Sequence, residues 1–211
     1  AAPFAAPSQS PLAFSPIIAV FPRFAKWGKM CYTEPDARLA VNDILEKWNF
    51  AMKKILFICH GNICRSPMAE FVMKKLVSDA RLTARFQIVS AATSTEEIWN
   101  GIGNPVYPPA KAALARHGIS CEGKRARQVT RADYAEYDYL IGMDGANIRN
   151  MLRIFGGDPE GKVAKLLSYA GSERDISDPW YTGDFGTTYD DVLEGCTAFL
   201  EYLQQNSKID T

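Results

Sequence analysis

The sequence predicts an α/β fold, in which a four-stranded parallel sheet is flanked by helices on both faces as a flavodoxin-like three-layer sandwich. Two observations lead to this prediction. From Lys53 onward, short apolar runs alternate with longer segments whose apolar residues recur at helical spacing, and such alternation is typical of parallel sheets with helical crossovers. The first run, KILFIC, is apolar almost throughout, as expected for a strand covered on both faces.

Four strands follow from these apolar runs. They are predicted at residues 54–59 (KILFIC), 85–93 (RFQIVSAAT), 137–144 (YDYLIGMD) and 162–170 (KVAKLLSYA). Each run is short and bounded by polar residues or glycine, which is typical of strands.

Four helices are predicted between and after the strands, at residues 66–80, 104–119, 145–157 and 188–205. Pro67 lies in the first turn of the first helix, where its missing N–H costs nothing. Gly118 and Gly156 close the second and third helices. Thr188 is the predicted N-cap of the last helix.

The first 51 residues differ in composition from the rest of the chain. Residues 1–16 are rich in Ala, Pro and Ser and carry no charged side chain, and residues 34–50 have the spacing of one short helix. We therefore expect two parts: a poorly structured N-terminal extension at 1–51 and a folded domain at 52–208.

Composition excludes several classes of protein. The chain of 211 residues has 24 basic and 24 acidic residues, a balance that argues against a nucleic-acid binder. No apolar run reaches the roughly 18 residues that span a bilayer. Five cysteines and two histidines form no ligand cluster, so no metal site is expected. Because the cysteine number is odd and the spacing loose, we expect a reduced, cytoplasmic protein.

The stretch between the first strand and the first helix is the predicted functional site. Ligands bind at the carboxyl ends of strands in such sheets, and the amino terminus of a helix attracts anions. Gly61 and Asn62 adopt positive φ at low cost, which lets successive amides point inward. The loop therefore predicts a phosphate-sized anion site, made of His60, Gly61, Asn62, Ile63, Cys64 and Arg65.

Cys59 and Arg65 give this loop a chemistry. Arg65 supplies a planar fork for two phosphoryl oxygens. Cys59 lies in the same positive field, which stabilises a thiolate placed for attack at phosphorus. Ser66 follows, where its hydroxyl can donate to that thiolate. A C-x5-R spacing alone would more often mean a buried cysteine and a surface arginine, so the surrounding strand, turn and helix start carry the prediction.

A phosphoenzyme route also needs a group that protonates the leaving oxygen and later deprotonates water. Asp178, in the segment SDPWYTGDFG, is the predicted acid. Pro179 biases Asp178 toward extended backbone, and Trp180 and Tyr181 are placed to wall a pocket for an aromatic ring. Taken alone, the Asp-Pro pair would read as a turn.

Six segments, in order, resemble those of low-molecular-weight protein tyrosine phosphatases: CHGNICRSP, SAATS, RHGI, ARQVTRADY, YLIGMD and DPWYTGDF. The resemblance spans residue 52 to about residue 205. It implies a four-stranded parallel sheet, no metal or organic cofactor, phosphotyrosine proteins as partners, and a monomer or weak dimer.

The resemblance also implies site residues. Cys59 is similar to the nucleophile, Arg65 to the phosphate clamp, Asp178 to the general acid and Ser66 to the donor to the thiolate. The residues that brace the loop from behind are matched by Asn62, Ser90 and His117. The structural aspartate of the family is matched by Asp144. The wall of the substrate pocket is matched by Ile63, Trp99, Trp180 and Tyr181.

Two further features of the sequence are each open to two interpretations. Cys64 is either a partner for a reversible disulfide with Cys59 or a packing residue. The basic segment 124–131 either steers anionic proteins or, as we favour, is a solvated face; its cations are Lys124, Arg125, Arg127 and Arg131.

Three other functions compete with phosphotyrosine hydrolysis. Arsenate reductase needs relay cysteines, which the segment MDGANIRNM lacks. A protein arginine phosphatase would carry a threonine where this chain has Ile63, and Ile63 favours a ring-accepting pocket. A non-catalytic phosphate-binding or redox module is disfavoured because Cys59, Arg65 and Asp178 occur together.

Overall fold

A computed structural model describes residues 52–206 of the chain. Its main sheet has four parallel strands, as the sequence predicts, and the structure gives their order as β2-β1-β5-β6. The central strand β1 pairs with β2 over its whole length, from Lys53 opposite Phe86 to Cys59 opposite Ala92. The strands are β1 (Lys53–Cys59), β2 (Phe86–Ala92), β5 (Tyr139–Gly142) and β6 (Val163–Lys165).

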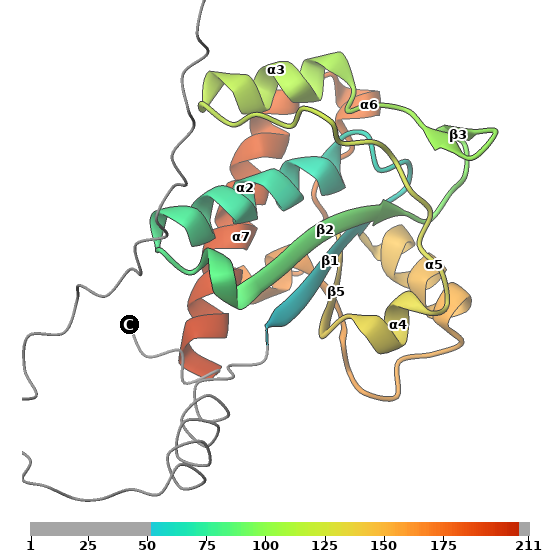
Figure 1. The fold of residues 1–211 in the computed structure, drawn as a ribbon, viewed down its shortest axis with the longest axis vertical. Coiled ribbons are helices and arrows are strands. Elements are labelled where there is room, and N and C mark those ends of the chain that lie inside the picture. Colours follow the sequence, from blue (N-terminus) through green and yellow to red (C-terminus); the bar gives the residue numbers. More distant parts are fainter. Residues whose placement is uncertain (1–51, 207–211) are drawn as a thin grey trace, which may run out of the picture. The chain divides into compact units, whose positions relative to one another are not determined.

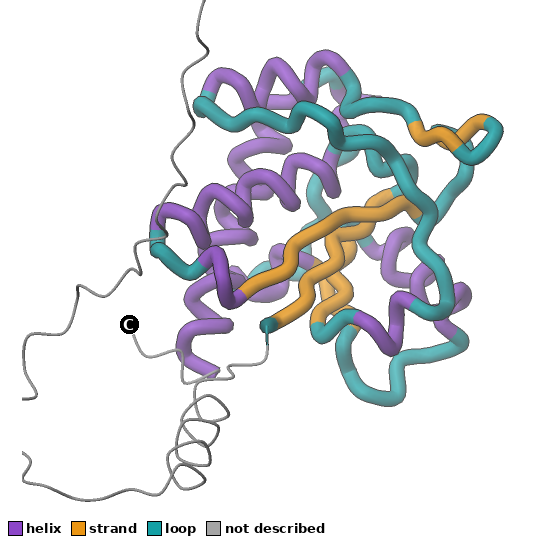
Figure 2. The backbone as a smooth tube through the Cα atoms, viewed as in Figure 1, coloured by secondary structure: helices purple, strands orange, loops and turns teal. Residues whose placement is uncertain are grey.

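Helices cover both faces of the sheet (Figures 1 and 2). The face with α2 carries most of the helical mass, since α2 packs on α7 and both pack on α3. The helices on this face are α2 (Arg65–Asp79), α3 (Pro108–Arg116) and α7 (Phe185–Asn206). The other face carries α4 (Asp133–Glu136) and α5 (Gly145–Phe155).

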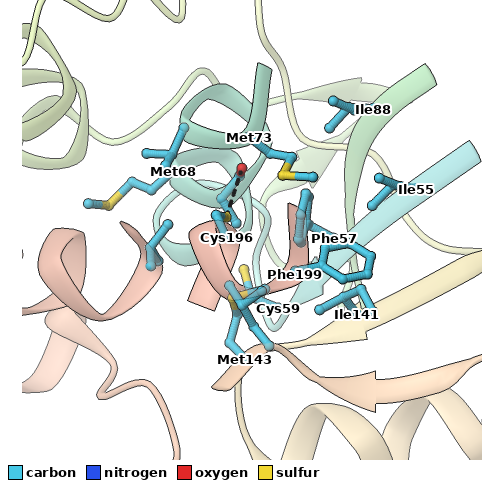
Figure 3. Close-up of a cluster of buried hydrophobic side chains, with 14 of the residues drawn as sticks. Ile55, Phe57, Cys59, Met68, Met73, Ile88, Ile141, Met143, Cys196 and Phe199 are labelled. Carbon is cyan, nitrogen blue, oxygen red and sulfur yellow. Dashed lines mark hydrogen bonds between the residues drawn. The ribbon is translucent and has the colours of Figure 1, made fainter. Parts of the chain in front are cut away.

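Strand β1 supplies apolar residues to both layers, which explains its nearly continuous apolar run. Ile55, Phe57 and Cys59 belong to the larger cluster, beneath α2 and α7. Leu56 and Ile58 belong to the smaller cluster, beneath α5. Figure 3 shows Cys59 within the larger cluster, which also holds Met143 and Phe199. The nucleophile candidate therefore stands at the end of the most buried strand.

The fourth strand is shorter than predicted. The chain leaves β6 at Lys165 and forms a 3₁₀-helix, η2 (Leu166–Ala170). The hydroxyl of Ser168 donates to the Lys165 carbonyl (2.6 Å), and Gly171 ends the turn at φ 73°. This turn puts Leu166 against Gly195 of α7, where a Cβ would lie 2.6 Å from the leucine. Packing against α7 thus overrides the strand pattern.

The last helix begins three residues earlier than predicted, and Thr188 is not its N-cap. Asp184 stands before Phe185 and accepts hydrogen bonds from the Thr187 amide (2.9 Å) and hydroxyl (2.6 Å). These bonds lower the pKa of Asp184 below its usual value. Thr188 is buried inside the first turn and donates to the Asp184 carbonyl (3.0 Å).

A small hairpin that the sequence analysis did not predict follows β2, and Figure 1 shows it projecting beyond the sheet. It consists of β3 (Ile98–Trp99) and β4 (Ile102–Gly103). Asn100 and Gly101 join the strands with φ 50° and 78°, the geometry of a two-residue primed turn. A short 3₁₀-helix, η1 (Thr83–Arg85), and a one-turn helix, α6 (Pro179–Thr182), complete the described elements.

The predicted extension at residues 1–51 lies outside the described residues, and the two-part division stays a prediction. Over residues 52–206, no helix combines the length and hydropathy that a membrane crossing requires.

Candidate active site

The loop between β1 and α2 curls around the carboxyl end of β1. Asn62 adopts the left-handed region at φ 57°. Gly61, predicted to share that conformation, is not among the residues with positive φ. A Cβ added at Gly61 would lie 3.1 Å from Glu97 Cγ, a close contact that a small shift of the glutamate side chain would have to relieve. One left-handed residue is thus enough to turn the loop into the helix.

Two donors point at the sulfur of Cys59, which is buried. The amide of Asn62 donates to Cys59 Sγ over 3.3 Å, and the hydroxyl of Ser66 donates over 3.1 Å. Hydrogen bonds to the charged form of a group favour that form. The geometry therefore suits a sulfur that carries negative charge, as the sequence predicts.

Arg65 begins α2 and lies buried between two carboxylates. Its Nη1 contacts Asp144 Oδ2 and its Nη2 contacts Asp178 Oδ2, each at 2.5 Å. Nη1 also donates to the Ile176 carbonyl (3.1 Å). Burial disfavours the guanidinium charge, but Cys59, Asp178 and Asp144 outweigh it and raise the pKa of Arg65 above its usual value. Arg65 is therefore a permanent, oriented cation.

Asp178 reaches the same site from the segment before α6. Its backbone is extended (φ −78°, ψ 112°), as expected before Pro179, and its Oδ1 accepts from the Trp180 amide (3.1 Å). The side chain is 24% exposed. Asp178 thus bridges the buried Arg65 and solvent, which is the position a proton-transfer group needs.

A cleft of about 170 Å³ opens above Cys59. Trp180 and Tyr181 form part of its wall and are 58% and 86% exposed. The predicted loop residues His60, Gly61, Ile63, Cys64 and Arg65 also line it, together with Glu96 and Glu97.

Trp99 does not line this cleft, although the sequence analysis placed it in the pocket wall. It sits on the β3–β4 hairpin directly across from Ile102, and these side chains are 70% and 63% exposed. Glu96 and Glu97, just before the hairpin, occupy the cleft rim instead. Sequence spacing alone did not specify which side chains of this segment face the cleft.

A buried polar network lies behind the loop. Asn62 Nδ2 donates to Ser66 Oγ (2.9 Å) and to Ser90 Oγ (2.8 Å), so the structure brings these three predicted residues together. The Asn62 Oδ1 accepts from the Arg127 amide (3.2 Å). The side chain of Asn62 is thereby held at both ends.

Two members of this network were missed by the sequence analysis. Ser90 Oγ donates to Glu70 Oε2 (2.6 Å), and Lys124 Nζ lies 3.0 Å from the same oxygen. The Lys124 side chain is only 11% exposed, so its assignment to a solvated face was wrong. A clue was present, since Glu70 lies among apolar residues on the buried side of its helix.

His117 was expected to brace the loop from behind, and the structure does not bring it there. It is exposed at the end of α3, where its ring stacks on Tyr189 of α7 with centroids 3.7 Å apart. The buried position that a bracing side chain would fill is taken by Lys124, from the segment that follows.

Three further cysteines lie within residues 52–206, and all three are buried. Burial, with the charges of Cys59 and Asp178, raises the pKa of Cys64 to about 12, so Cys64 stays protonated at neutral pH. Cys121 and Cys196 are buried and unpaired by disulfide. In residues 52–206, no three potential metal ligands cluster.

Comparison with known proteins identifies the family. The sequence model described as "Low molecular weight phosphotyrosine protein phosphatase" matches residues 54–209. The chicken protein of that name is 41% identical over 155 residues, which are 71% of this chain and 95% of the relative. The Bacillus subtilis (strain 168) low molecular weight protein-tyrosine-phosphatase YfkJ is 35% identical over 160 residues, 75% of this chain and all of the relative.

Solved structures agree. The crystal structure of Bacillus subtilis YfkJ superposes with a TM-score of 0.69 at 36% identity, covering 74% of this chain and 96% of that one. Vibrio vulnificus Wzb superposes with a TM-score of 0.62 at 28% identity, covering 72% and 100%. The fold and the loop define a phosphatase of the α/β class.

The chain belongs to the low molecular weight phosphotyrosine protein phosphatase family. It is therefore a protein tyrosine phosphatase, a hydrolase of phosphoric monoesters, and the predicted function is confirmed at this level. The comparisons favour this function over the arginine phosphatase and arsenate reductase alternatives.

Proposed function

We propose that this phosphatase hydrolyses phosphotyrosine in two steps through a cysteinyl-phosphate on Cys59. The observation that carries the proposal is the pair of donors on one buried sulfur, Asn62 N at 3.3 Å and Ser66 Oγ at 3.1 Å. A packing cysteine needs neither donor. A nucleophilic thiolate needs both, because its charge would otherwise be buried without compensation.

Arg65 binds the phosphoryl group in this scheme. Its guanidinium already lies between two carboxylates, so it is oriented before substrate arrives. Asp144 on Nη1 fixes the plane of the fork, and the loop amides add donors at the start of α2. Preorganised positive charge of this kind stabilises the phosphoryl oxygens in the transition state at little reorganisation cost.

Asp178 moves the proton. Substrate brings two negative charges next to Asp178 Oδ2, and like charges favour protonation of a carboxylate. In the first step the Cys59 sulfur bonds to phosphorus, the bond from phosphorus to the tyrosine oxygen breaks, and that oxygen takes the Asp178 proton. In the second step water attacks phosphorus, Asp178 accepts its proton, and the sulfur–phosphorus bond breaks to restore the thiolate. The Ser66 hydroxyl stabilises that leaving thiolate.

The cleft selects a ring on the ester. Ile63 supplies an apolar part of its lining, and the exposed side chains of Trp180 and Tyr181 form part of its wall. The related Vibrio vulnificus Wzb has been solved with benzylphosphonate, a phosphonate carrying an aromatic ring. We propose phosphotyrosine proteins as substrates, a monomer or weak dimer as the working state, and the cytoplasm as the compartment, where Cys59 stays reduced.

The test is a pH–rate profile on an aryl phosphate, measured for the wild type and for Asp178→Asn. We expect kcat to fall by about 10²–10⁴-fold, with loss of the basic limb but retention of a burst of phenol release. Asp175→Asn is the matched control, because Asp175 accepts from Gly145 and Lys165 outside the cleft. If Asp178→Asn kept the basic limb of the pH–rate profile unchanged, Asp178 would not be the group that transfers the proton. Failure of rapid-quench labelling to detect phosphate on Cys59 would remove the covalent step.

A further inference from the structure

Trp180 forms part of the cleft wall although most of its surface is exposed. It is 58% exposed and belongs to the one-turn helix α6. The backbone hydrogen bonds of α6 are local, since the Tyr181 and Thr182 amides donate to the Asp178 carbonyl (3.1 and 3.3 Å). Such bonds fix the course of the backbone but not the side-chain rotamer, and exposed side chains change rotamer on the nanosecond timescale or faster. A side chain that serves as a fixed wall therefore needs a contact of its own.

Tyr107 supplies such a contact. Its ring centroid lies 5.3 Å from that of Trp180, and the two planes are inclined at 56°. Aromatic rings attract one another at centroid separations of about 4.5–7 Å and prefer offset or inclined arrangements to a face-to-face sandwich. Tyr107 is not among the residues that line the cleft. It therefore supports the indole from outside the space that substrate enters.

Tyr107 is itself held in place through its backbone and its ring. Its amide donates to the Ile63 carbonyl (2.9 Å), and its carbonyl accepts from the Lys111 amide (3.0 Å). It is the N-cap of α3 and is followed by Pro108 at the start of that helix, which restricts the backbone. Its ring also lies 5.9 Å from the ring of Phe185, at the start of α7. Tyr107 is thus anchored between α3 and α7 and can fix a more exposed neighbour.

The contacts of Tyr107 join two apolar parts of the cleft lining. Ile63 and Trp180 both line the cleft. Tyr107 binds the first through a backbone hydrogen bond and contacts the second through its ring. The position of the indole relative to Ile63 therefore depends on Tyr107. A slot whose walls are already in place loses less conformational entropy when a ring enters than one whose wall must first be ordered.

We propose that Tyr107 is a positioning residue that determines specificity: it holds Trp180 in place relative to Ile63 and so keeps a slot ready for the aromatic ring of the substrate. The inference rests on the proposed function, in which a ring carries the phosphoryl group. Because ring binding is shared by the ground state and the transition state, its loss raises KM and leaves kcat unchanged. Binding of an aryl phosphate ester should therefore depend on Tyr107, whereas binding of inorganic phosphate should not.

Tyr107→Ala is the test variant, and Tyr107→Phe, which keeps the ring, is the rescue. For a phosphotyrosine peptide we expect Tyr107→Ala to raise KM by about threefold and to leave kcat within about 1.5-fold of wild type. Tyr107→Phe should keep both constants within about 1.5-fold. Tyr202→Ala is the matched control, because it removes a ring pair of nearly the same geometry, with Tyr169 at 5.1 Å and 58°, and neither tyrosine lines the cleft. It should leave KM unchanged.

A double-mutant cycle tests whether Tyr107 acts through Trp180. In the Trp180→Ala background, Tyr107→Ala should raise KM no further, because the side chain that it supports is already gone. The inhibition constant of inorganic phosphate should stay at the wild-type value in every variant. This second measurement also establishes that the phosphate loop of each variant is folded.

Three results would each overturn the proposal: an unchanged KM in Tyr107→Ala, a further rise of KM in the double variant, or an equal rise in the inhibition constant of inorganic phosphate. The proposed function is tested separately on the wild type. If the wild type hydrolysed a phosphoserine peptide as readily as the matching phosphotyrosine peptide, the proposed function would be rejected, and the inference with it.

Discussion

The two sides of the loop from Cys59 to Ser66 are built in opposite ways. On the cleft side, Trp180 and Tyr181 are 58% and 86% exposed and make few polar contacts. On the inner side, Asn62 and Ser90 are 1% and 0% exposed and fully hydrogen-bonded. Substitutions on the cleft side should therefore have little effect on stability. Substitutions on the inner side should affect both the stability of the fold and the hydrogen bonds to the Cys59 sulfur.

The residue that joins the two sides should give the largest effect. Arg65→Lys keeps a cation but loses the planar fork that contacts Asp144 and Asp178. We expect kcat/KM to fall by about 10³-fold. Steady-state kinetics on an aryl phosphate measure this. Arg174→Lys, at the ion pairs with Asp191 and Glu194 outside the cleft, is the control and should leave kcat/KM unchanged. If kcat/KM of Arg65→Lys fell by less than about tenfold, the positive charge alone, without the planar fork, would be sufficient.

The inner side is tested by Ser90→Ala. This change leaves Glu70 and one Asn62 hydrogen without their buried partner. We expect the free energy of unfolding to fall by about 1–3 kcal/mol and kcat to fall by about tenfold. Urea unfolding and kinetics measure the two, with exposed Ser120→Ala as control. A stability loss without a kcat loss would separate the network from the chemistry.

The cleft side is tested by Trp180→Ala and Tyr181→Ala. We expect KM for a phosphotyrosine peptide to rise by about fivefold, kcat to stay nearly constant, and unfolding free energy to change by less than about 0.5 kcal/mol. Trp99→Ala should leave KM unchanged, because Trp99 does not line the cleft. A rise in KM for Trp99→Ala would show that the hairpin closes over bound substrate.

The smallest predicted effect is on the alkaline side of the pH profile. Burial lowers the pKa of Lys124 below its usual value of 10.5, against the opposing effect of Glu70. Lys124 therefore loses its proton at a lower pH than exposed lysines do. Activity should fall a fewfold as pH rises through that pKa, and Lys124→Arg should remove the fall because arginine stays charged. Lys74 and Arg127 are the other cations near this group.

The sequence predicted the parts of the site that are local in the chain. Cys59, Arg65 and Ser66 lie within eight positions, so one strand, one turn and one helix fix their relation. Asp178 lies far from this loop in the chain, and its own segment taken alone would have indicated a turn, so its assignment as the acid depended on the family resemblance. Its extended backbone before Pro179 agrees with the sequence prediction.

The errors arose where distant segments compete for one position. Nothing in the local pattern distinguishes His117, exposed on α3, from Lys124, buried against Glu70. A basic run is normally a solvated face, and only the packing of α2 against the 124–128 segment shows that one of its cations is internal. Similarly, Thr188 has a capping side chain, but Asp184 fits the start of α7 because the chain turns at Gly183, with φ 72°. Pairing across long loops is decided by tertiary contacts that spacing does not encode.

Asp144 has a consequence that reaches beyond the cleft. One of its oxygens caps α5 through the Asn147 amide (2.6 Å), and the other grips Arg65. The Asp144 carboxylate thus links the orientation of α5, on the other face of the sheet, to the orientation of the Arg65 guanidinium. Both oxygens of Asp144 are engaged, so a substitution at this position would disturb the α5 cap and the Arg65 contact together.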